Sequence, residues 1–281
     1  MPIVVDPAEV FRGTIVLAVP HMDDCVLGCG GTLAQLPCGR AVHVVYATDG
    51  RASPAPVWPW LDRRVPDLAP TRADEARAAM GHLGVPQENI HFLGLPDGQL
   101  RRQRAALHDA LVARLRQIQP DHIWLPFRYD RHADHVALNH AISAACREAA
   151  SSAALYEYFV YYRWRLLPEG DVRRYLRPDD VWRVNIAAVA AHKRAALDMF
   201  KSQTTRFYPW QNRPNLKPQF LDEVSRTPEF FLRCTASQPG PAVFDRARTW
   251  IRVSHWLEPR IKKGKDYMVD LWWRGLRGPL E

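Results

Sequence analysis

Short apolar runs alternate with longer segments of helical periodicity through the first half of the chain. Apolar runs typical of buried strands cover residues 14–19, 41–47, 90–93, 122–125 and 155–162. Segments typical of helices cover residues 26–36, 71–83, 101–118 and 133–149. This alternation predicts βαβ units, and hence an α/β fold: a Rossmann-like three-layer sandwich with a mostly parallel sheet.

Local signals set the expected ends of these segments. Thr71 is a predicted N-cap, with Asp74 three residues later completing a start similar to a capping box, and Gly84 follows the helix end. The proline-rich stretch 49–70 has no periodicity and begins at the end of the second predicted strand. We expect it to form an irregular loop that walls a pocket. Two further helices are predicted at 190–201 and 218–224.

The chain is long enough for one large domain with an appendage. Its 281 residues are 47% hydrophobic, which allows a sizeable buried core. We predict a single α/β domain over residues 1–235. A C-terminal extension, helical or irregular and rich in basic residues and tryptophan, is predicted over residues 236–281.

The positive charge is concentrated in that extension. The net charge is +8, and residues 246–277 hold nine Lys/Arg against three Asp/Glu, so this segment contributes +6. Because the rest is nearly neutral, we expect no nucleic-acid partner. The mixture of basic residues with Trp250, Trp256, Trp272 and Trp273 suits peripheral contact with an anionic membrane surface. The alternative, favoured because the aromatics lack clear helical phasing, is a tail packed on the domain with its charges solvated.

The cysteines and the N-terminal segment indicate a cytoplasmic location. Five cysteines, with no tight pairing beyond Cys25 and Cys29, argue against a disulfide framework. No apolar run approaches the roughly 18 residues of a membrane span, and the N-terminal residues lack the pattern of a secretory signal. Cys25 and Cys29 stand among small apolar residues of a predicted helix, where a cysteine usually packs as a small hydrophobe.

Two clusters of histidine and aspartate follow two of the predicted strands. His21-Met22-Asp23-Asp24 follows the first strand, and Asp130-Arg131-His132-Ala133-Asp134-His135 follows the apolar run 122–127. Since ligands of such sheets bind outside the carboxyl ends of the strands, we expect both clusters to share one site. His21, Asp24 and His135 supply the three ligands that a hydrolytic metal site needs. Of His132 and His135, one binds the ion and the other faces the substrate.

Several segments, in order, resemble a known enzyme family. They are PHMDDCVLGCGGTLA, TDG at 48–50, TRADEARAAMGHLGV, FLGLPDGQL and DRHADHVALNHA, spanning about 15–141. AAHKRAALDMFKSQ at 190–203 is similar to a later helix of the same family. Together they resemble the LmbE-like or PIG-L family of zinc-dependent N-acetyl-sugar deacetylases.

The resemblance assigns a role to each member of the two clusters. It implies one zinc ion held by His21, Asp24 and His135, with Asp23 as the general base. His132 becomes the residue that stabilises the oxyanion or protonates the departing amine. Asp134 becomes its orienting partner.

Other positions carry less direct implications. Arg72 and Asp97 match positions that contact sugar hydroxyls in some members. Met22 and Ala133 replace the usual prolines, and Cys25 stands where many members have glutamate, whose charge a thiol cannot reproduce. The Gly28-Cys29-Gly30-Gly31 run lacks the lysine of a phosphate-binding loop, so it predicts close helix packing.

The resemblance therefore implies a hydrolase. It would remove an N-acetyl group from an N-acetylglucosamine-type amino sugar or glycoconjugate by attack of a zinc-activated water. One alternative is a non-catalytic carbohydrate-binding protein on the same fold, and another is a deacylase of a non-sugar amide. Two histidines and one carboxylate are also the ligand set of iron-dependent oxygenases.

Overall fold

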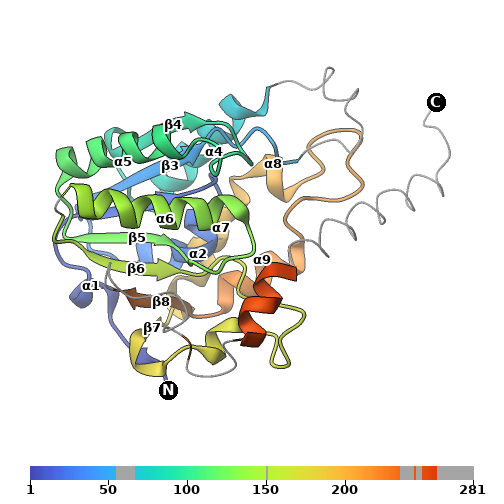
Figure 1. Ribbon diagram of the computed structural model, residues 1–281. Helices are drawn as coiled ribbons and strands as arrows, with labels where there is room; N and C mark the ends of the chain where they lie inside the picture. Colours follow the sequence, from blue (N-terminus) through green and yellow to red (C-terminus); the bar gives the residue numbers. More distant parts are fainter. Residues whose placement is uncertain (55–66, 150, 235–243, 245–248, 258–281) are drawn as a thin grey trace.

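One eight-stranded sheet organises the part of the chain that the structure describes, residues 1–54, 67–149, 151–234, 244 and 249–257 (Figure 1). This computed structural model orders the strands β1-β7-β8-β6-β5-β2-β3-β4. Only β8 runs antiparallel to its neighbours, β6 and β7. The strands are β1 (Ile3–Val4), β2 (Ile15–Val19), β3 (Val42–Thr48), β4 (Ile90–Leu95), β5 (His122–Pro126), β6 (Ala154–Tyr158), β7 (Val181–Val184) and β8 (Glu229–Cys234). The predicted α/β fold with a mostly parallel sheet is confirmed.

Helices cover both faces of this sheet. The labelled α-helices are α1 (Pro7–Val10), α2 (Asp24–Leu33), α4 (Leu68–His82), α5 (Arg104–Ile118), α6 (Ala133–Glu148), α7 (Ala190–Asp198), α8 (Lys201–Thr204) and α9 (Pro218–Arg226), with short 3₁₀ turns at 87–89, 172–175, 178–180 and 187–189. A further helix, without a label, covers residues 249–257. The buried residues of α2, α4, α7 and α9 join one hydrophobic core, and those of α5 and α6 join the other. Every residue of β2 is buried, as expected for a strand covered on both faces.

Helix α2 approaches the sheet closely at its glycines. A Cβ on Gly28 would lie 2.5 Å from the Tyr158 ring, and one on Gly31 would lie 2.6 Å from Ile186. The Tyr158 hydroxyl also donates a hydrogen bond to the carbonyl of Ala18 in β2 (3.0 Å). The predicted close packing of this glycine-rich run is confirmed, and it fixes the helix that starts at Asp24.

A buried ion pair anchors the same helix from strand β8. The carboxylate of Glu229 accepts the backbone N–H groups of Gly31 (2.8 Å) and Thr32 (2.7 Å) and pairs with Lys193 Nζ (2.7 Å). Lys193 also donates to the carbonyl of Leu27 (2.9 Å). Both charged side chains are buried. The charge of each is therefore compensated by the other side chain and by backbone groups of α2.

The expected start of the helix at 71–83 is wrong. Helix α4 begins three residues earlier, at Leu68, and the side chain of Asp67 caps it by accepting the N–H of Ala69 (3.1 Å). Pro70 then falls in the first helical turn, where proline is tolerated because the N–H it lacks has no helical partner. Strands β7 and β8 were not predicted. They lie in the second half of the chain, where the sequence pattern is looser.

Part of the C-terminal region packs on the domain. Residues 249–257 form a helix whose Ile251 and Ser254 are buried, while Trp250 and Trp256 are exposed. Phe244 is also buried, with its ring centroid 5.1 Å from that of Tyr129. The remainder of the predicted extension and loop residues 55–66 lie outside the described residues.

Membrane contact by the tail and the cytoplasmic location stay predictions. None of the described helices combines the length and the apolar character needed to cross a membrane.

Candidate metal centre

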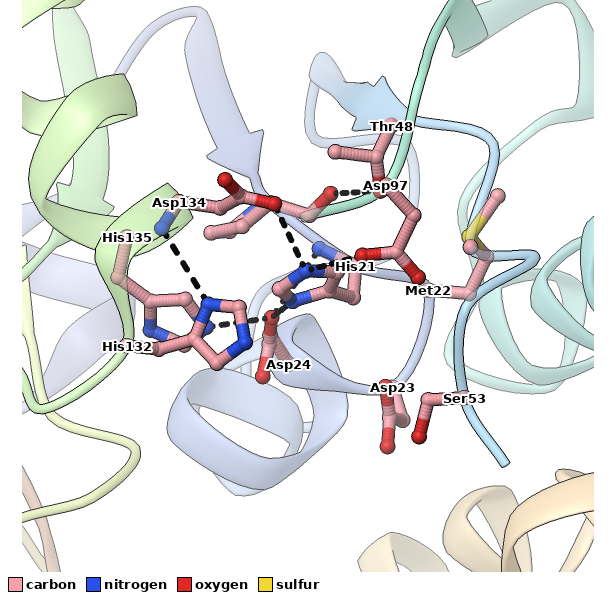
Figure 2. Close-up of polar contacts among 12 residues, drawn as sticks. His21, Met22, Asp23, Asp24, Thr48, Ser53, Asp97, His132, Asp134 and His135 are labelled. Carbon is pink, nitrogen blue, oxygen red and sulfur yellow. Dashed lines mark hydrogen bonds and ion pairs between the residues drawn. The ribbon is translucent and has the colours of Figure 1, made fainter. Parts of the chain in front are cut away.

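The two histidine and aspartate clusters meet at one edge of the sheet (Figure 2). His21 lies in the turn after β2, and Asp24 is the first residue of α2. His132 caps α6, and His135 lies in that helix's first turn. Because β2 and β5 are parallel neighbours, their carboxyl ends bring these four side chains together.

The Asp24 carboxylate is the centre of the cluster. Its Oδ2 lies 2.9 Å from His21 Nδ1 and 3.0 Å from His135 Nε2. Nitrogen atoms of His21, His132 and His135 also lie within 4.8 Å of one another. The structure thus brings together the three predicted ligands, with His132 beside them as a fourth donor.

The charges of this cluster fit a bound cation. Burial alone would lower the pKa of His135, but the charges of Asp24 and Asp130 raise it to about 9. The pKa of His21 is likewise raised against the effect of burial by contacts with Asp134, Asp24 and Asp97. The carboxylates around the two rings thus favour positive charge at this point. A divalent cation bound there would supply that charge in place of ring protons.

His135 gives a second indication of fit. Its ring is completely buried, and neither nitrogen makes a hydrogen bond of acceptable geometry, although both lie within 3.3 Å of carboxylate oxygens. Both contacts are therefore ion-pair contacts without the full direction of a hydrogen bond. A metal at Nε2 would add a directional partner on that side of the ring.

Each ligand histidine has a carboxylate behind it. His21 Nε2 lies 3.1 Å from Asp97 Oδ1, and His135 Nδ1 lies 3.3 Å from Asp130 Oδ2. Such outer carboxylates fix the orientation and tautomer of histidine ligands at metal sites. Asp97 contacts His21 in the structure, and its expected contact with a sugar stays a prediction. Asp130 received no role from the sequence, because its place at the head of the second cluster does not show which side chain it faces.

A second group of possible ligand atoms belongs to His21, Asp97 and Asp134. Its carboxylates already have backbone partners: Asp134 accepts the N–H groups of Gly98 (2.7 Å) and Leu100 (3.1 Å), and Asp97 accepts that of Ala52 (3.1 Å). These contacts fit a role for the two carboxylates in supporting the His21 ring. The set around Asp24 is therefore the better candidate for an ion.

Asp23 points away from the ligand set (Figure 2), and it pairs with Arg72. Arg72 NH2 lies 2.6 Å from Asp23 Oδ1, and NH1 donates to the carbonyl of Gly50 (3.0 Å). Arg72 is 1% exposed. The Asp23 carboxylate is therefore the partner of its buried charge. Its expected contact with a sugar stays a prediction. Burial raises the pKa of Asp23, and the charge of Arg72 partly offsets that rise.

The ring of His132 accepts a hydrogen bond from the backbone of Asp134, two residues further along the chain. The N–H of Asp134 donates to His132 Nδ1 (3.3 Å), so the ring proton of the neutral form is on Nε2. Burial, reinforced by the charges of His21 and His135, lowers the pKa of His132 to about 3. Asp134 thus orients His132 through its main chain, while its carboxylate serves the turn at Gly98.

Cys25 supports the ligand loop as a neutral thiol. Its Sγ donates to the carbonyl of Met22 (3.2 Å) and lies 3.2 Å from the hydroxyl of Tyr46. Burial raises its pKa to about 12. Met22 is also buried, with Sδ 2.8 Å from where a Cβ on Gly50 would lie. The two atypical residues of this loop are therefore part of its packing.

Residues late in the chain also reach the site. His255 Nε2 lies 3.0 Å from the carbonyl of Asp130, the residue whose carboxylate faces His135. Gln203, at the end of the helix-like motif 190–203, donates to the carbonyl of Ser53 (2.9 Å) in the loop beside Asp23. The motif 190–203 singled out the segment that ends at Gln203 without showing what Gln203 contacts, and His255 had no signal in the sequence pattern.

Comparison with known proteins matches residues 16–146 to the family described as PIG-L: GlcNAc-PI de-N-acetylase. A diacetylchitobiose deacetylase of Thermococcus kodakarensis is 33% identical over 125 residues, which are 41% of this chain and 42% of that protein. The match thus spans less than half of the relative's length. The resemblance predicted from the motifs is confirmed.

Solved structures show the same fold at lower identity. The N,N'-diacetylchitobiose deacetylase of Pyrococcus horikoshii aligns with a TM-score of 0.58 at 22% identity, covering 80% of this chain and 85% of that one. GalB, a 4-carboxy-2-hydroxymuconate hydratase of Pseudomonas putida KT2440, aligns with a TM-score of 0.55 at 18% identity, covering 81% and 98%. Since a hydratase shares the fold, the reaction has to be argued from the site.

Proposed function

From the premise that residues 16–146 form a PIG-L family domain, we propose that this protein is a metal-dependent N-deacetylase. Its substrate would be an amino sugar or glycoconjugate of the N-acetylglucosamine type. The observation that carries the proposal is the convergence of His21 Nδ1 and His135 Nε2 on one oxygen of Asp24, beside a separate carboxylate held by Arg72. Three ligands and an adjacent base are the parts that hydrolysis of an amide requires.

We propose zinc as the ion and His21, Asp24 and His135 as its ligands. Two imidazoles and one carboxylate form a donor set typical of catalytic zinc. When bound, zinc lowers the pKa of a coordinated water to about 7 and polarises a carbonyl oxygen. The same donor set accepts other divalent metals, so the identity of the ion is part of the proposal.

Asp23 would accept the proton of the attacking water. It precedes Asp24 directly in the chain, and a pKa raised by burial suits a carboxylate that takes up a proton and later releases it. Arg72 holds Oδ1, which leaves the other carboxylate oxygen for proton transfer. The protonated Asp23 would then return its proton to the departing amine.

His132 would act as a neutral hydrogen-bond donor. Its Nδ1 is occupied by the N–H of Asp134, which leaves the Nε2–H to face the negative charge that develops on the carbonyl oxygen. A histidine whose pKa is about 3 is neutral at physiological pH. This favours oxyanion stabilisation over the alternative that His132 protonates the amine.

The relative's name supports the substrate class, because diacetylchitobiose is an N-acetylated amino sugar. The runner-up is a non-catalytic carbohydrate-binding protein. The retained Asp23–Arg72 pair favours hydrolysis, since a purely binding protein has no need of a base beside a metal site.

Metal analysis combined with acetate release tests the proposal. We expect about one zinc per chain and acetate release from a panel of N-acetylglucosaminides. Asp23→Asn should keep the metal and lower turnover about 10²- to 10⁴-fold, whereas His135→Ala should lose the metal. Asp74→Asn, on the exposed side of α4, is the matched control. Unchanged turnover of Asp23→Asn would exclude it as the base, and sugar binding without metal would favour the runner-up.

A further inference from the structure

Glu75 is a buried carboxylate of α4 that the proposed ligand set and proton transfers do not use. Its Oε1 accepts the backbone N–H of Ser202 (2.7 Å), and its Oε2 accepts the hydroxyl of the same residue (2.6 Å). Ser202 lies in α8 and is completely buried. The two oxygens of one carboxylate thus hold α8 against α4, which lies next to it (Figure 1).

Gln203 connects α8 to the loop at residues 50–53. Its Nε2 donates to Ser202 Oγ (3.0 Å) and to the carbonyl of Ser53 (2.9 Å). Its Oε1 accepts Asn215 Nδ2 (2.7 Å), which also donates to Ser53 Oγ (2.8 Å). Gln203 is completely buried, so its amide group cannot readily exchange these partners for water. Ser53 is therefore held through both its backbone and its side chain.

Gly50 connects the other end of that loop to Arg72. The Gly50 carbonyl accepts Arg72 NH1 (3.0 Å), and Arg72 NH2 holds Asp23 (2.6 Å). A Cβ on Gly50 would lie 3.2 Å from Arg72 NH1, so the loop backbone passes close to the guanidinium because no side chain separates them. Among the residues that the structure describes, the buried Nε of Arg72 has no acceptor. The position of the guanidinium thus depends on its contacts with Gly50 and Asp23.

These contacts form a closed ring that begins and ends on α4. Arg72 and Glu75 are three residues apart, so they lie on the same side of the helix. Burial raises the pKa of Glu75, and the Ser202 contacts and the charge of Arg72 partly offset that rise. From Glu75 the ring passes through α8 and the loop at 50–53 and returns to Arg72. Because both ends are fixed to one helix, a displacement of α8 would move the loop that places Arg72.

We infer that Glu75 is a positioning residue for Asp23, acting through α8 and the loop at 50–53 on the arginine that holds this carboxylate. The inference rests on the proposed function, since it takes Asp23 as the base. Glu75 acts indirectly, by fixing the direction of the Asp23 oxygen that takes up the proton. A misplacement of about 1 Å in such an alignment lowers a rate by up to about 100-fold.

Turnover of two α8 variants tests the inference. Ser202→Ala removes the hydroxyl that contacts Glu75, and Gln203→Ala removes the contact with Ser53. We expect each to lower kcat for acetate release about tenfold with KM and zinc content unchanged, because the base is misplaced while substrate and metal still bind. A higher KM with unchanged kcat would overturn the inference.

Ser225→Ala is the matched control for Ser202→Ala. Ser225 is also buried, and its hydroxyl donates over the same 2.6 Å, but to the carbonyl of Leu221 in its own helix, α9. We expect the control to keep the original kcat, because it leaves the ring intact. An equal fall of kcat in both serine variants would overturn the inference.

Two substitutions at Glu75 separate positioning from general packing. Glu75→Gln retains an oxygen that accepts the N–H of Ser202, so kcat should stay within about threefold of the original. Glu75→Ala removes both acceptors and should lower kcat about tenfold. Adding Gln203→Ala to Glu75→Ala should lower kcat little further, because both changes break the same ring. Independent, multiplying effects of the two changes would contradict the inference.

Amide exchange tests the ring without catalysis. Hydrogen–deuterium exchange of a peptide covering residues 50–53 is measured on the full chain. We expect Ser202→Ala and Glu75→Ala to speed up this exchange about tenfold, and Ser225→Ala to leave it unchanged. Unchanged exchange in all variants, or faster exchange with an unchanged kcat, would overturn the inference. Faster exchange in a protein whose original form releases no acetate from any N-acetylglucosaminide would instead contradict the proposed function and support the ring.

Discussion

The two halves of the chain contribute to the candidate site in different ways. All proposed ligands and proton-transfer groups come from the first region, residues 15–146, where they follow strands β2 and β5. The second region, residues 151–257 as far as described, supplies supports: Glu229 against α2, Gln203 against the loop at Ser53, and His255 against Asp130. The family match stops at residue 146, so it covers the chemistry and leaves out these supports.

This difference shows how a motif and its support are encoded. His21 and Asp24 are three residues apart, and the turn after one strand is enough to bring them together. Glu229 reaches Gly31 only after the chain has crossed the sheet and returned as an antiparallel strand. Local sequence encodes the first arrangement, and the complete fold determines the second. Variants in each region separate the two contributions.

The largest effect, on stability, is expected from breaking the buried ion pair between Lys193 and Glu229 that supports α2. Glu229→Ala leaves Lys193 charged and buried and removes the acceptor of two backbone N–H groups, which should lower the free energy of unfolding by about 3 to 5 kcal/mol. Urea denaturation measures the change. Lys193→Met/Glu229→Leu should recover part of it, because no unpaired charge remains. A Glu229→Ala protein as stable as the original would show that α2 does not depend on the second region.

The next effect concerns Asp23, the proposed base in the first region. Arg72→Leu removes the group that holds Asp23, and we expect turnover to fall about 100-fold with metal content unchanged. The charge of Arg72 lowers the pKa of Asp23, so its loss should raise that pKa. The acid limb of the pH–rate profile should therefore move to higher pH. Arg77→Leu, one turn further along α4, should leave the profile in place.

A smaller effect is expected where the second region touches the catalytic loop. His255→Ala removes the N–H that the Asp130 carbonyl accepts, and Asp130 orients His135. We expect zinc affinity to fall about tenfold, measured by competition with a chelator. His255→Asn, which retains an N–H donor, should recover part of the loss, and His192→Ala on the surface should change nothing. Unchanged affinity in His255→Ala would confine the metal site to the first region.

The smallest effect tests where α4 begins. Asp67→Ala should lower the free energy of unfolding by about 1 kcal/mol, because Asp67 caps the helix. Thr71→Ala should have less effect, because Thr71 lies inside the helix. A larger loss from Thr71→Ala would favour the start predicted from the sequence.

The sequence predicted the fold of the first region well for a physical reason. Strands β2, β3 and β5 are largely buried and read as apolar runs, and the helices of this region have clear periodicity. Strand β7 is only four residues long, and β8 carries the charged Glu229, so neither gives a strong pattern. The sequence did not identify Asp67 as the cap of α4, because Pro70 suggested that the loop continued to residue 70.

The candidate site was predictable to the same extent. His21, Asp24, His132 and His135 follow strands directly, and their convergence could be inferred from topology. The partners of Arg72, Asp97 and Asp130 could not, because each depends on side-chain direction across separate elements. Their contacts with Asp23, His21 and His135 become visible only in the folded chain.

The ion pair under α2 also bears on the order of events during synthesis. The ribosome releases the proposed ligands His21, Asp24 and His135 well before Glu229 and His255 emerge. Until then, the helix that begins at Asp24 lacks the carboxylate that secures its backbone, and the loop at Asp130 lacks its C-terminal contact. A nascent chain would therefore hold the ligands without their final geometry. Metal loading should be a late step, completed once the last described helix has docked.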